Sequence, residues 1–266
     1  MSSSFPSRFP SKPTISSSPT YNNSTTMASS KSTIVLVTGA NQGVGFETAK
    51  KLAKENPGYH ILMGSRNAER GEAAAAKLKA ENLSVEAITI DISSDESITA
   101  AAKQVESQFG RLDVLINNAG IAIDGSFKPG DSYRELMLTT YNTNVFGSVQ
   151  TTEAFIPLLE KGTLPRIIFV SSSLGSFGDN RVPGGYPVYR STKTALNMFA
   201  FQYAHRFEKQ GWKINIACPG FLATNLNNYT GTGRVETGAI NISRLATLGK
   251  DGETGTYSNK EGPLPW

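Results

Sequence analysis

A tyrosine and a lysine four residues apart, Tyr189 and Lys193, are the residues of this sequence best suited to chemistry. On a helix, side chains at this spacing share one face, with Cβ atoms roughly 5–6 Å apart. An ammonium group so close favours the ionised phenol and lowers the tyrosine pKa from its usual value of about 10. The pair therefore predicts a proton donor that works near neutrality. An exposed pair on a helix surface is the alternative, and the surrounding motifs decide between the two.

A glycine-rich segment predicts a phosphate-binding turn. It follows the apolar run 34–37 and precedes a helical pattern that begins near residue 43. Glycine permits a tight turn there and lets backbone N–H groups approach a pyrophosphate at the helix N-terminus. A strand before the turn and a helix after it are the context that a dinucleotide-binding site requires. The residues of this turn that we expect to contact the cofactor are Gly39, Asn41, Gln42, Gly43, Val44 and Gly45.

Further motifs follow the turn, and their order along the chain is more specific for a protein family than any single motif. They are Asn117-Asn118-Ala119-Gly120 after an apolar run, Asn144 in a helical pattern, Ser172 with Gly175 three residues later, the Tyr189 and Lys193 pair, and Cys218-Pro219-Gly220. With this series the chain resembles the short-chain dehydrogenase/reductase superfamily, in its compact single-domain type, from about residue 33 to residue 266. Within the superfamily it is similar to the NADPH-dependent carbonyl-reductase-like enzymes.

The resemblance implies four catalytic residues, Asn144, Ser172, Tyr189 and Lys193. The Ser-x-x-Gly pattern selects Ser172 among three consecutive serines, and its hydroxyl would bond the substrate carbonyl while Tyr189 delivers the proton. Lys193 would bond the nicotinamide ribose and lower the Tyr189 pKa. Asn144, rather than Asn142, would position a water linked to the lysine. Because asparagine competes for backbone hydrogen bonds inside a helix, a local kink is also expected at Asn144.

The end of the second expected strand bears on the choice of cofactor. NAD enzymes usually carry an acidic residue there for the ribose 2′-hydroxyl, and the segment 63–67 has none. Arg66 can instead form a charged fork with a 2′-phosphate, so NADP(H) is expected and NAD(H) is less favoured. Gln42 stands where NADPH-preferring relatives often carry lysine or arginine, which leaves Arg66 as the one basic contact. An ordinary surface arginine in a loop is the other interpretation of Arg66.

The resemblance implies further cofactor contacts at the ends of later strands. Asp91 and Ile92 would hold the adenine, although Asp91 can also belong to the N-terminal cluster of the next helix. Pro219 begins a turn beneath the nicotinamide, although a plain structural turn would look the same. The remaining contacts that the resemblance implies are Asn118, Ala119, Gly120, Tyr189, Lys193, Gly220, Leu222 and Thr224.

Apolar runs of strand length alternate with helical patterns, which predicts an α/β fold with a single doubly wound parallel sheet, the Rossmann fold, and helices on both faces. We expect strands near 33–38, 58–64, 84–90, 112–117, 165–171, 212–217 and 254–258. Helices are expected near 43–55, 68–80, 94–109, 131–160 and 186–210. Ligands of such folds bind beyond the carboxyl ends of the strands, where all of the motifs fall.

The composition of the chain bears on its number of domains, its N-terminal segment and its cellular compartment. Of its 266 residues, 31–266 suit a single domain, and the Ser-, Thr-, Pro- and Asn-rich segment 1–30 is expected to be a disordered tail. The tail also fits an organelle transit peptide or an upstream extension before Met27; the extension, and a cytoplasmic protein, are preferred. With Cys218 as the one cysteine, no intramolecular disulfide is expected, which suits a reducing compartment.

Several classes of partner are not expected. A net charge of +4 is too small to indicate a nucleic-acid-binding protein. The apolar runs are too short to form a membrane-spanning helix. His60 and His205 have no clustered partners in the sequence, so no metal site is expected. A small carbonyl or alcohol compound is the expected partner, and the resemblance allows a homodimer or a homotetramer.

The resemblance implies an enzyme, an NADPH-dependent oxidoreductase that interconverts a carbonyl and an alcohol on a small organic molecule. Hydride would come from the nicotinamide and the proton from Tyr189. One alternative is an NAD-linked alcohol dehydrogenase or a double-bond reductase of the same family. Another is a cofactor-bound scaffold or sensor without turnover, against which the four intact catalytic positions argue. The segment 225–245 is expected to be a loop that covers the substrate pocket.

Overall fold

The computed structural model describes residues 32–179 and 185–266. The segment 1–30, predicted from its composition to be disordered, lies outside the described residues. So do residues 180–184 of the Gly/Pro-rich loop that precedes the Tyr189 helix.

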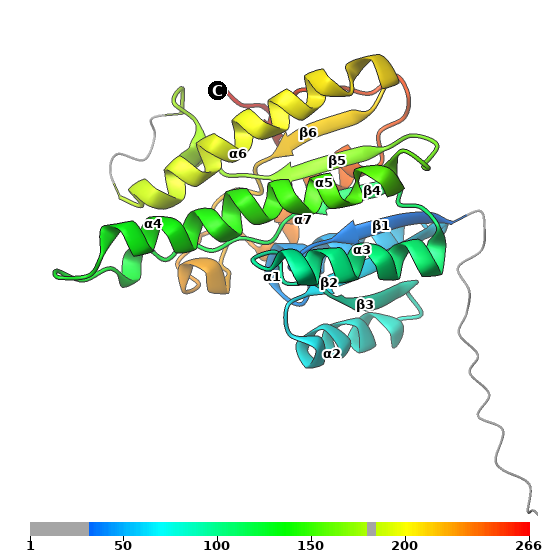
Figure 1. Cartoon of the computed structure of the whole chain (residues 1–266), viewed down its shortest axis with the longest axis horizontal. Coiled ribbons are helices and arrows are strands. Elements are labelled where there is room, and N and C mark those ends of the chain that lie inside the picture. The colour runs from blue at the N-terminus through cyan, green and yellow to red at the C-terminus, as the bar shows by residue number, and fades with distance from the viewer. Residues whose placement is uncertain (1–31, 180–184) are drawn as a thin grey trace, which may run out of the picture.

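An eight-stranded sheet forms the centre of the fold (Figure 1), with strand order β3-β2-β1-β4-β5-β6-β7-β8. Neighbouring strands are parallel from β3 through β7, and only β8 runs antiparallel to its neighbour. The predicted Rossmann fold is therefore confirmed, with one short antiparallel strand added at an edge. The strands are β1 (Thr33–Val37), β2 (Tyr59–Ser65), β3 (Val85–Thr89), β4 (Val114–Asn117), β5 (Arg166–Val170), β6 (Lys213–Ala217), β7 (Tyr257–Asn259) and β8 (Gly262–Pro263).

Helices cover both faces of the sheet. They are α1 (Gly43–Glu55), α2 (Ala68–Lys79), α3 (Asp95–Phe109), α4 (Tyr133–Tyr141), α5 (Ser148–Leu159), α6 (Pro187–Arg206) and α7 (Ala239–Ala246). One core layer joins Ile34 and Leu36 to apolar residues of α3, α5 and α6, which lie on the viewer's side of the sheet in Figure 1. The other joins Val35 and Val37 to residues of α1, α2 and α7.

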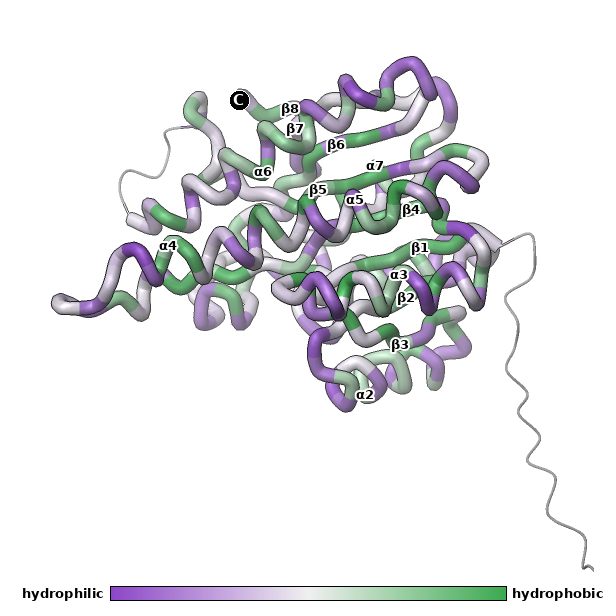
Figure 2. Tube along the Cα trace, in the orientation of Figure 1, coloured by the Kyte–Doolittle hydropathy of each residue, from purple (hydrophilic) through white to green (hydrophobic). Residues whose placement is uncertain are grey.

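This double coverage explains why the strands read as continuous apolar runs. Successive strand residues point to opposite faces, and a parallel sheet with helices on both faces buries both sets. Figure 2 shows hydrophobic residues along the central strands and hydrophilic ones mainly on the helices and connecting loops. Both sets in β1 are buried: Leu36 and Val37 are each 0 % exposed.

The expected helix 131–160 is interrupted. Helix α4 passes into a π-helical segment, Asn142–Gly147, before α5 begins. Such π-helical segments are frequent at functional sites, and this one contains Asn144, where the sequence predicts a local kink. Gly147 is required there, because a Cβ at this position would overlap the backbone oxygen of Ile92.

The chain after β6 also differs from expectation. The predicted covering loop 225–245 contains helix α7, whose residues Ala239, Ile242, Leu245 and Ala246 are buried at helical spacing. Three glycines, at positions 231, 233 and 238, obscure that pattern in the sequence. Strand β8 is too short to leave an apolar pattern.

Across residues 32–179 and 185–266 no helix has both the length and the apolar character needed to cross a bilayer. The same residues contain no cluster of three or more His, Cys, Asp or Glu side chains placed to hold a metal ion.

Substitution of Gly147 tests the packing of the π-helical segment. We expect Gly147→Ala to lower the free energy of unfolding by about 1–3 kcal/mol, because the added methyl group must displace the Ile92 carbonyl. Chemical denaturation followed by circular dichroism measures the change. Gly58→Ala is the matched control, since no atom lies within 4 Å of its added Cβ. Equal stabilities of the two variants would contradict the close approach.

Candidate active site

A cavity of about 370 Å³ opens at the carboxyl ends of the central strands. It lies at β1 and β4, where the strand order reverses, which is the usual ligand site of such sheets. Its volume is within the range of small-molecule sites. The predicted site residues that line the cavity are Gly39, Asn41, Gln42, Gly43, Val44, Gly45, Arg66, Asp91, Ile92, Asn118, Ala119, Gly120, Tyr189, Lys193, Pro219 and Thr224.

The glycine-rich turn forms one wall of the cavity. Gly39 and Gly43 have φ angles of +65° and +59°, a backbone region that other residues rarely adopt. A Cβ at Gly45 would overlap the Gly39 carbonyl oxygen, so the start of α1 packs directly on the turn. The requirement for glycine at all three positions follows from these geometries.

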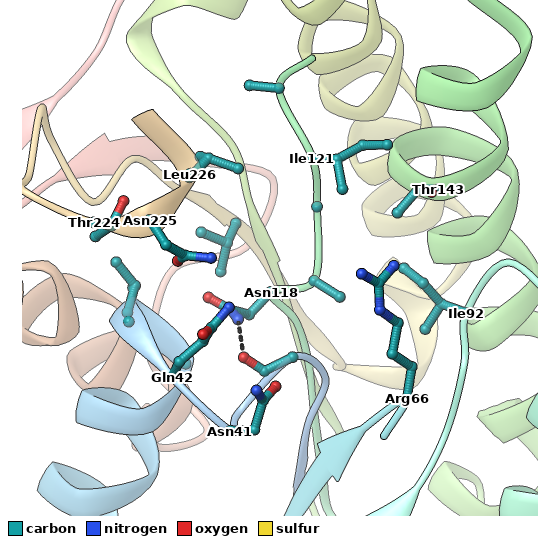
Figure 3. Close-up of a pocket in the computed structure, with 18 of the residues that line it drawn as sticks. Asn41, Gln42, Arg66, Ile92, Asn118, Ile121, Thr143, Thr224, Asn225 and Leu226 are labelled. Carbon is teal, nitrogen blue, oxygen red and sulfur yellow. Dashed lines mark hydrogen bonds between the residues drawn. The ribbon is translucent and has the colours of Figure 1, made fainter. Parts of the chain in front are cut away.

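Two polar side chains hold this turn against the loop that follows β4. The buried Thr38 hydroxyl accepts hydrogen bonds from the backbone N–H groups of Asn118 and Ala119, each at 3.0 Å. In return, the Asn118 side-chain amide donates to the carbonyl oxygens of Thr38 (2.8 Å) and Gly39 (3.3 Å). Figure 3 shows Asn118 in the middle of the cavity, facing the turn that carries Asn41 and Gln42. Thr38 was not predicted as a site residue, because only the fold reveals what its hydroxyl contacts.

Tyr189 and Lys193 are both buried, at 7 % and 4 % exposure. They lie on one face of α6, with the Lys193 Nζ 5.7 Å from the centre of the Tyr189 ring. The ammonium donates a hydrogen bond to the Val170 carbonyl oxygen at 2.9 Å. The predicted approach of the two side chains is therefore present, and both residues line the cavity.

The predicted effect of the lysine on the tyrosine is wrong for the cofactor-free protein. Burial raises the pKa of Tyr189, the nearby Cys218 sulfur adds to the rise, and a hydrogen bond with the Ser172 hydroxyl opposes it. Burial also lowers the pKa of Lys193 to about 8. Both shifts have the same cause, because a desolvated site favours the neutral form of each group. Tyr189 is consequently protonated at neutral pH.

Ser172 and Asn144 do not line the cavity but adjoin residues that do. Besides its hydrogen bond with Tyr189, Ser172 accepts a hydrogen bond at its backbone oxygen from the Tyr257 hydroxyl at 2.6 Å. Asn144 is fully buried, accepts from the Ile121 N–H and donates to the Ile121 carbonyl, both at 2.8 Å. Asn144 therefore braces the loop after β4.

Gly220 and Leu222 also lie outside the cavity lining. Leu222 is 5 % exposed and packs against Gly233 and Gly238, where added Cβ atoms would meet its side chain. The segment after it supplies other lining residues that the sequence did not single out, Asn225 and Leu226. Figure 3 shows these two beside Thr224, across the cavity from Arg66 and Ile92.

A second arginine joins Arg66 at the adenosine end predicted for the cavity. Arg70 lines the same cavity, and its backbone N–H donates to the side chain of Asn67, the N-cap of α2, at 2.8 Å. Neither guanidinium has an ion-pair partner among residues 32–179 and 185–266. The Asp91 carboxylate, also in the lining, accepts from the Ser93 N–H and hydroxyl at 2.9 and 2.6 Å. Sequence reasoning missed Arg70, although its spacing of four from Arg66 was a usable signal.

The buried ammonium of Lys193 makes a prediction about stability. Below pH 8 the Lys193 side chain is protonated in both the folded and the unfolded chain. The folded chain is then destabilised by the full cost of desolvating the ammonium group. Between the folded pKa of about 8 and the ordinary value of 10.5 only the unfolded chain holds it, so stability rises with pH. We expect Lys193→Met to be more stable than the wild type at pH 7 by roughly 1–2 kcal/mol, after loss of the Val170 hydrogen bond.

Thermal unfolding at pH 7, 8, 9 and 10 measures this difference, which should shrink as the pH rises. Lys209→Met, at an exposed position, controls for general loss of a positive charge. A stability difference that grew with pH would contradict the assignment of a desolvated Lys193.

Comparisons with known proteins agree with this geometry. The family model described as short chain dehydrogenase matches residues 33–234. The short-chain dehydrogenase anuI of Penicillium roqueforti is 42% identical over 238 residues, 85% of this chain and 93% of that protein. The (+)-neomenthol dehydrogenase of Arabidopsis thaliana is 31% identical over 281 residues, covering 84% of this chain and 94% of its own.

Solved structures show the same relationship. The NADPH-bound carbonyl reductase from chicken fatty liver superimposes with a TM-score of 0.78 at 26% identity, covering 89% of this chain and 100% of its own. Salutaridine reductase from Papaver somniferum gives a TM-score of 0.73 at 26% identity, with 84% and 98% covered. The family model spans most of the chain and the curated relatives match over nearly their whole length. This chain therefore belongs to the short-chain dehydrogenase/reductase family of oxidoreductases.

Proposed function

We propose that this protein is an NADPH-dependent enzyme that interconverts a carbonyl and an alcohol on a small organic molecule. The observation that carries the proposal is Tyr189, a buried and protonated phenol that lines a cavity of about 370 Å³, beside the Ser172 hydroxyl and Lys193. A catalytic acid needs a proton to give and a position beside the reacting oxygen. The proposed catalytic residues are Asn144, Ser172, Tyr189 and Lys193.

The fit of a dinucleotide rests on features of the cavity itself. At Gly39 and Gly45 the glycine turn leaves too little room for a side chain, where backbone N–H groups would face a pyrophosphate. Ser171 is one of the lining residues, and its buried hydroxyl has no hydrogen-bond partner among the described residues. A buried polar group without a partner is costly, so a ligand that bonds it is favoured. Arg66 and Arg70 also line the cavity, and neither guanidinium has an ion-pair partner among the described residues.

The chemistry divides between cofactor and protein. A bound nicotinamide supplies the hydride for reduction of a carbonyl carbon, or accepts it in the reverse direction. As negative charge develops on the carbonyl oxygen, Tyr189 gives it the phenol proton while the Ser172 hydroxyl holds it by a hydrogen bond. The proton and the hydride together convert the C=O group into CH–OH. Because burial raises the Tyr189 pKa, the protonated form that reduction needs is the resting form.

Asn144 and Lys193 support this step differently. Lys193 lies close enough to the Tyr189 ring to stabilise the phenolate left after proton transfer. Asn144 holds Ile121, whose loop lines the cavity. The names of relatives support both the reaction and the cofactor: one solved neighbour is a carbonyl reductase with NADPH bound, and a curated relative is a dehydrogenase of the alcohol neomenthol.

Loss of the Tyr189 hydroxyl tests the reaction. Assays would combine NADPH with aliphatic aldehydes, cyclic ketones including menthone, and quinones, and follow cofactor fluorescence. We expect Tyr189→Phe to bind NADPH normally and to lose about 10²–10⁴-fold in turnover, as a positioned general acid does. Tyr59→Phe, at the amino end of β2 and away from the cavity, is the control. Near-normal turnover by Tyr189→Phe would refute this proton donor.

Substitution of the two arginines tests cofactor choice. Losing a charge-assisted hydrogen bond costs about 1.5–3 kcal/mol, and each 1.4 kcal/mol is about tenfold in affinity. We expect Arg66→Ala to weaken NADPH roughly ten- to a hundredfold, and Arg70→Ala to weaken it by a smaller factor, with NADH nearly unaffected by either. Fluorescence titration measures both cofactors, and Arg206→Ala, an exposed arginine at the far end of α6, serves as the control. Equal losses of affinity for NADH and NADPH would mean that the arginines stabilise the loop conformation and do not bind the 2′-phosphate.

A further inference from the structure

Helix α6 begins without a cap from its own sequence. Its N-cap residue, Tyr186, has left-handed backbone angles of φ 54° and ψ 45° and makes no side-chain cap hydrogen bond. Pro187 follows at the first helical position and has no N–H group. The first helical hydrogen bond is donated by the Arg190 N–H to the Tyr186 carbonyl at 2.9 Å. The N–H groups of Val188 and Tyr189 therefore need acceptors from elsewhere.

Asp124 supplies those acceptors from a distant loop. Its Oδ1 accepts from the Val188 N–H at 2.8 Å, and its two oxygens lie 3.3 and 3.2 Å from the Tyr189 N. The contact joins positions 64 and 65 residues apart in the chain. A carboxylate here also lies at the positive end of the α6 dipole. One side chain thus satisfies both orphan donors of the turn that carries the proton donor.

The loop that contains Asp124 also lines the cavity, and a second set of hydrogen bonds connects it to α6. Ile121, Ala122 and Ile123 line the cavity, and Ile121 is bonded at both backbone groups by Asn144. The Asn144 amide also donates to the Thr192 hydroxyl at 3.0 Å. That hydroxyl in turn donates to the Tyr189 carbonyl at 2.7 Å. The loop therefore reaches the backbone of Tyr189 at its N–H and at its carbonyl.

We propose that Asp124 is a positioning residue for Tyr189, which fixes the phenol relative to the cavity by bonding the Val188 and Tyr189 N–H groups. Asp124 lies on the polypeptide segment that forms the cavity wall, so it ties the placement of the proton donor to that wall. The inference rests on the proposed function, in which Tyr189 gives the proton. Asp124 takes no part in proton transfer and acts only through the first turn of α6.

Amide hydrogen exchange of the cofactor-free protein tests the contact directly. We expect exchange of a peptide spanning 186–193 to rise at least tenfold in Asp124→Ala and to remain near the wild type in Asp124→Asn, whose Oδ1 can still accept both N–H groups. Asp131→Ala is the matched control, because that carboxylate lies in the same loop and, within the described part of the chain, accepts only from the Lys128 N–H, at 2.8 Å. Unchanged exchange in Asp124→Ala overturns the inference.

Turnover with NADPH and menthone, or the panel carbonyl that reacts fastest, tests the consequence for Tyr189. We expect Asp124→Ala to lose at least about tenfold in kcat with the NADPH affinity within threefold of the wild type, and Asp124→Asn to restore most of it. In a Tyr189→Phe background Asp124→Ala should have little further effect, because the two residues act in one step. Equal losses in both backgrounds overturn the positioning role. Retained turnover in Tyr189→Phe alone would instead refute the proposed function.

Asp124→Glu covers the case in which Asp124→Ala does not fold. It keeps the charge and moves the carboxylate by one methylene group, so we expect a folded protein with faster exchange over 186–193 and at least a threefold lower kcat. Wild-type values for both measurements would overturn the inference.

Discussion

The hydrogen bonds between the end of β1 and the loop after β4 are the interaction on which the rest of the site depends. Thr38 and Asn118 each bond the backbone of the opposite segment, at the point where the sheet reverses its order. These hydrogen bonds add to the backbone pairing of β1 with β4 and join the glycine turn to the loop that carries Ile121. The joined segments form one wall of the cavity, which residues at the start of α1 and on α6 also line. The cofactor end and the chemical end of the cavity therefore share a support.

Burial has opposite effects on the stability and the chemistry of this site. A buried ammonium at Lys193 and a buried phenol at Tyr189 are favoured in their neutral forms. For the phenol this is an advantage, because the neutral form is the one that the proposed proton transfer requires. For the lysine, burial of the ammonium lowers the stability of the folded protein, and one hydrogen bond to the Val170 carbonyl offsets part of this loss. Strained or desolvated groups of this kind are common where activity and stability conflict.

Much of the fold and of the site could be predicted from the sequence. Strands covered on both faces leave apolar runs that stand out, and residues such as Gly39, Arg66 and Tyr189 occupy strand ends or a helix face that those runs define. Spacing along the chain is enough when the partners lie on one element or one turn.

The rest depends on contacts between distant segments. The role of Asp124 could not be predicted from the sequence, because its hydrogen-bond partners lie 64 and 65 residues away in the chain. An aspartate is also a common residue in a loop. The pKa of Tyr189 was misjudged because spacing reports the neighbouring charge of Lys193 but not the depth of burial, which here outweighs it. Helix α7 was obscured by preceding glycines, whose small size serves the packing of Leu222 and not a flexible loop.

The long sequence separation between Asp124 and the start of α6 has a consequence for how this protein becomes active. Closing a loop of that size costs entropy before any contact is gained, so the contact forms only once the strands β4 and β5 have paired and α6 has docked. The amino-terminal half contains the glycine turn and both arginines, whereas Tyr189 and the lining residues Pro219, Thr224, Asn225 and Leu226 come later in the chain. A nascent or partly folded chain thus carries only one wall of the cavity, and the cavity is complete only after the last strands and helices have joined the sheet.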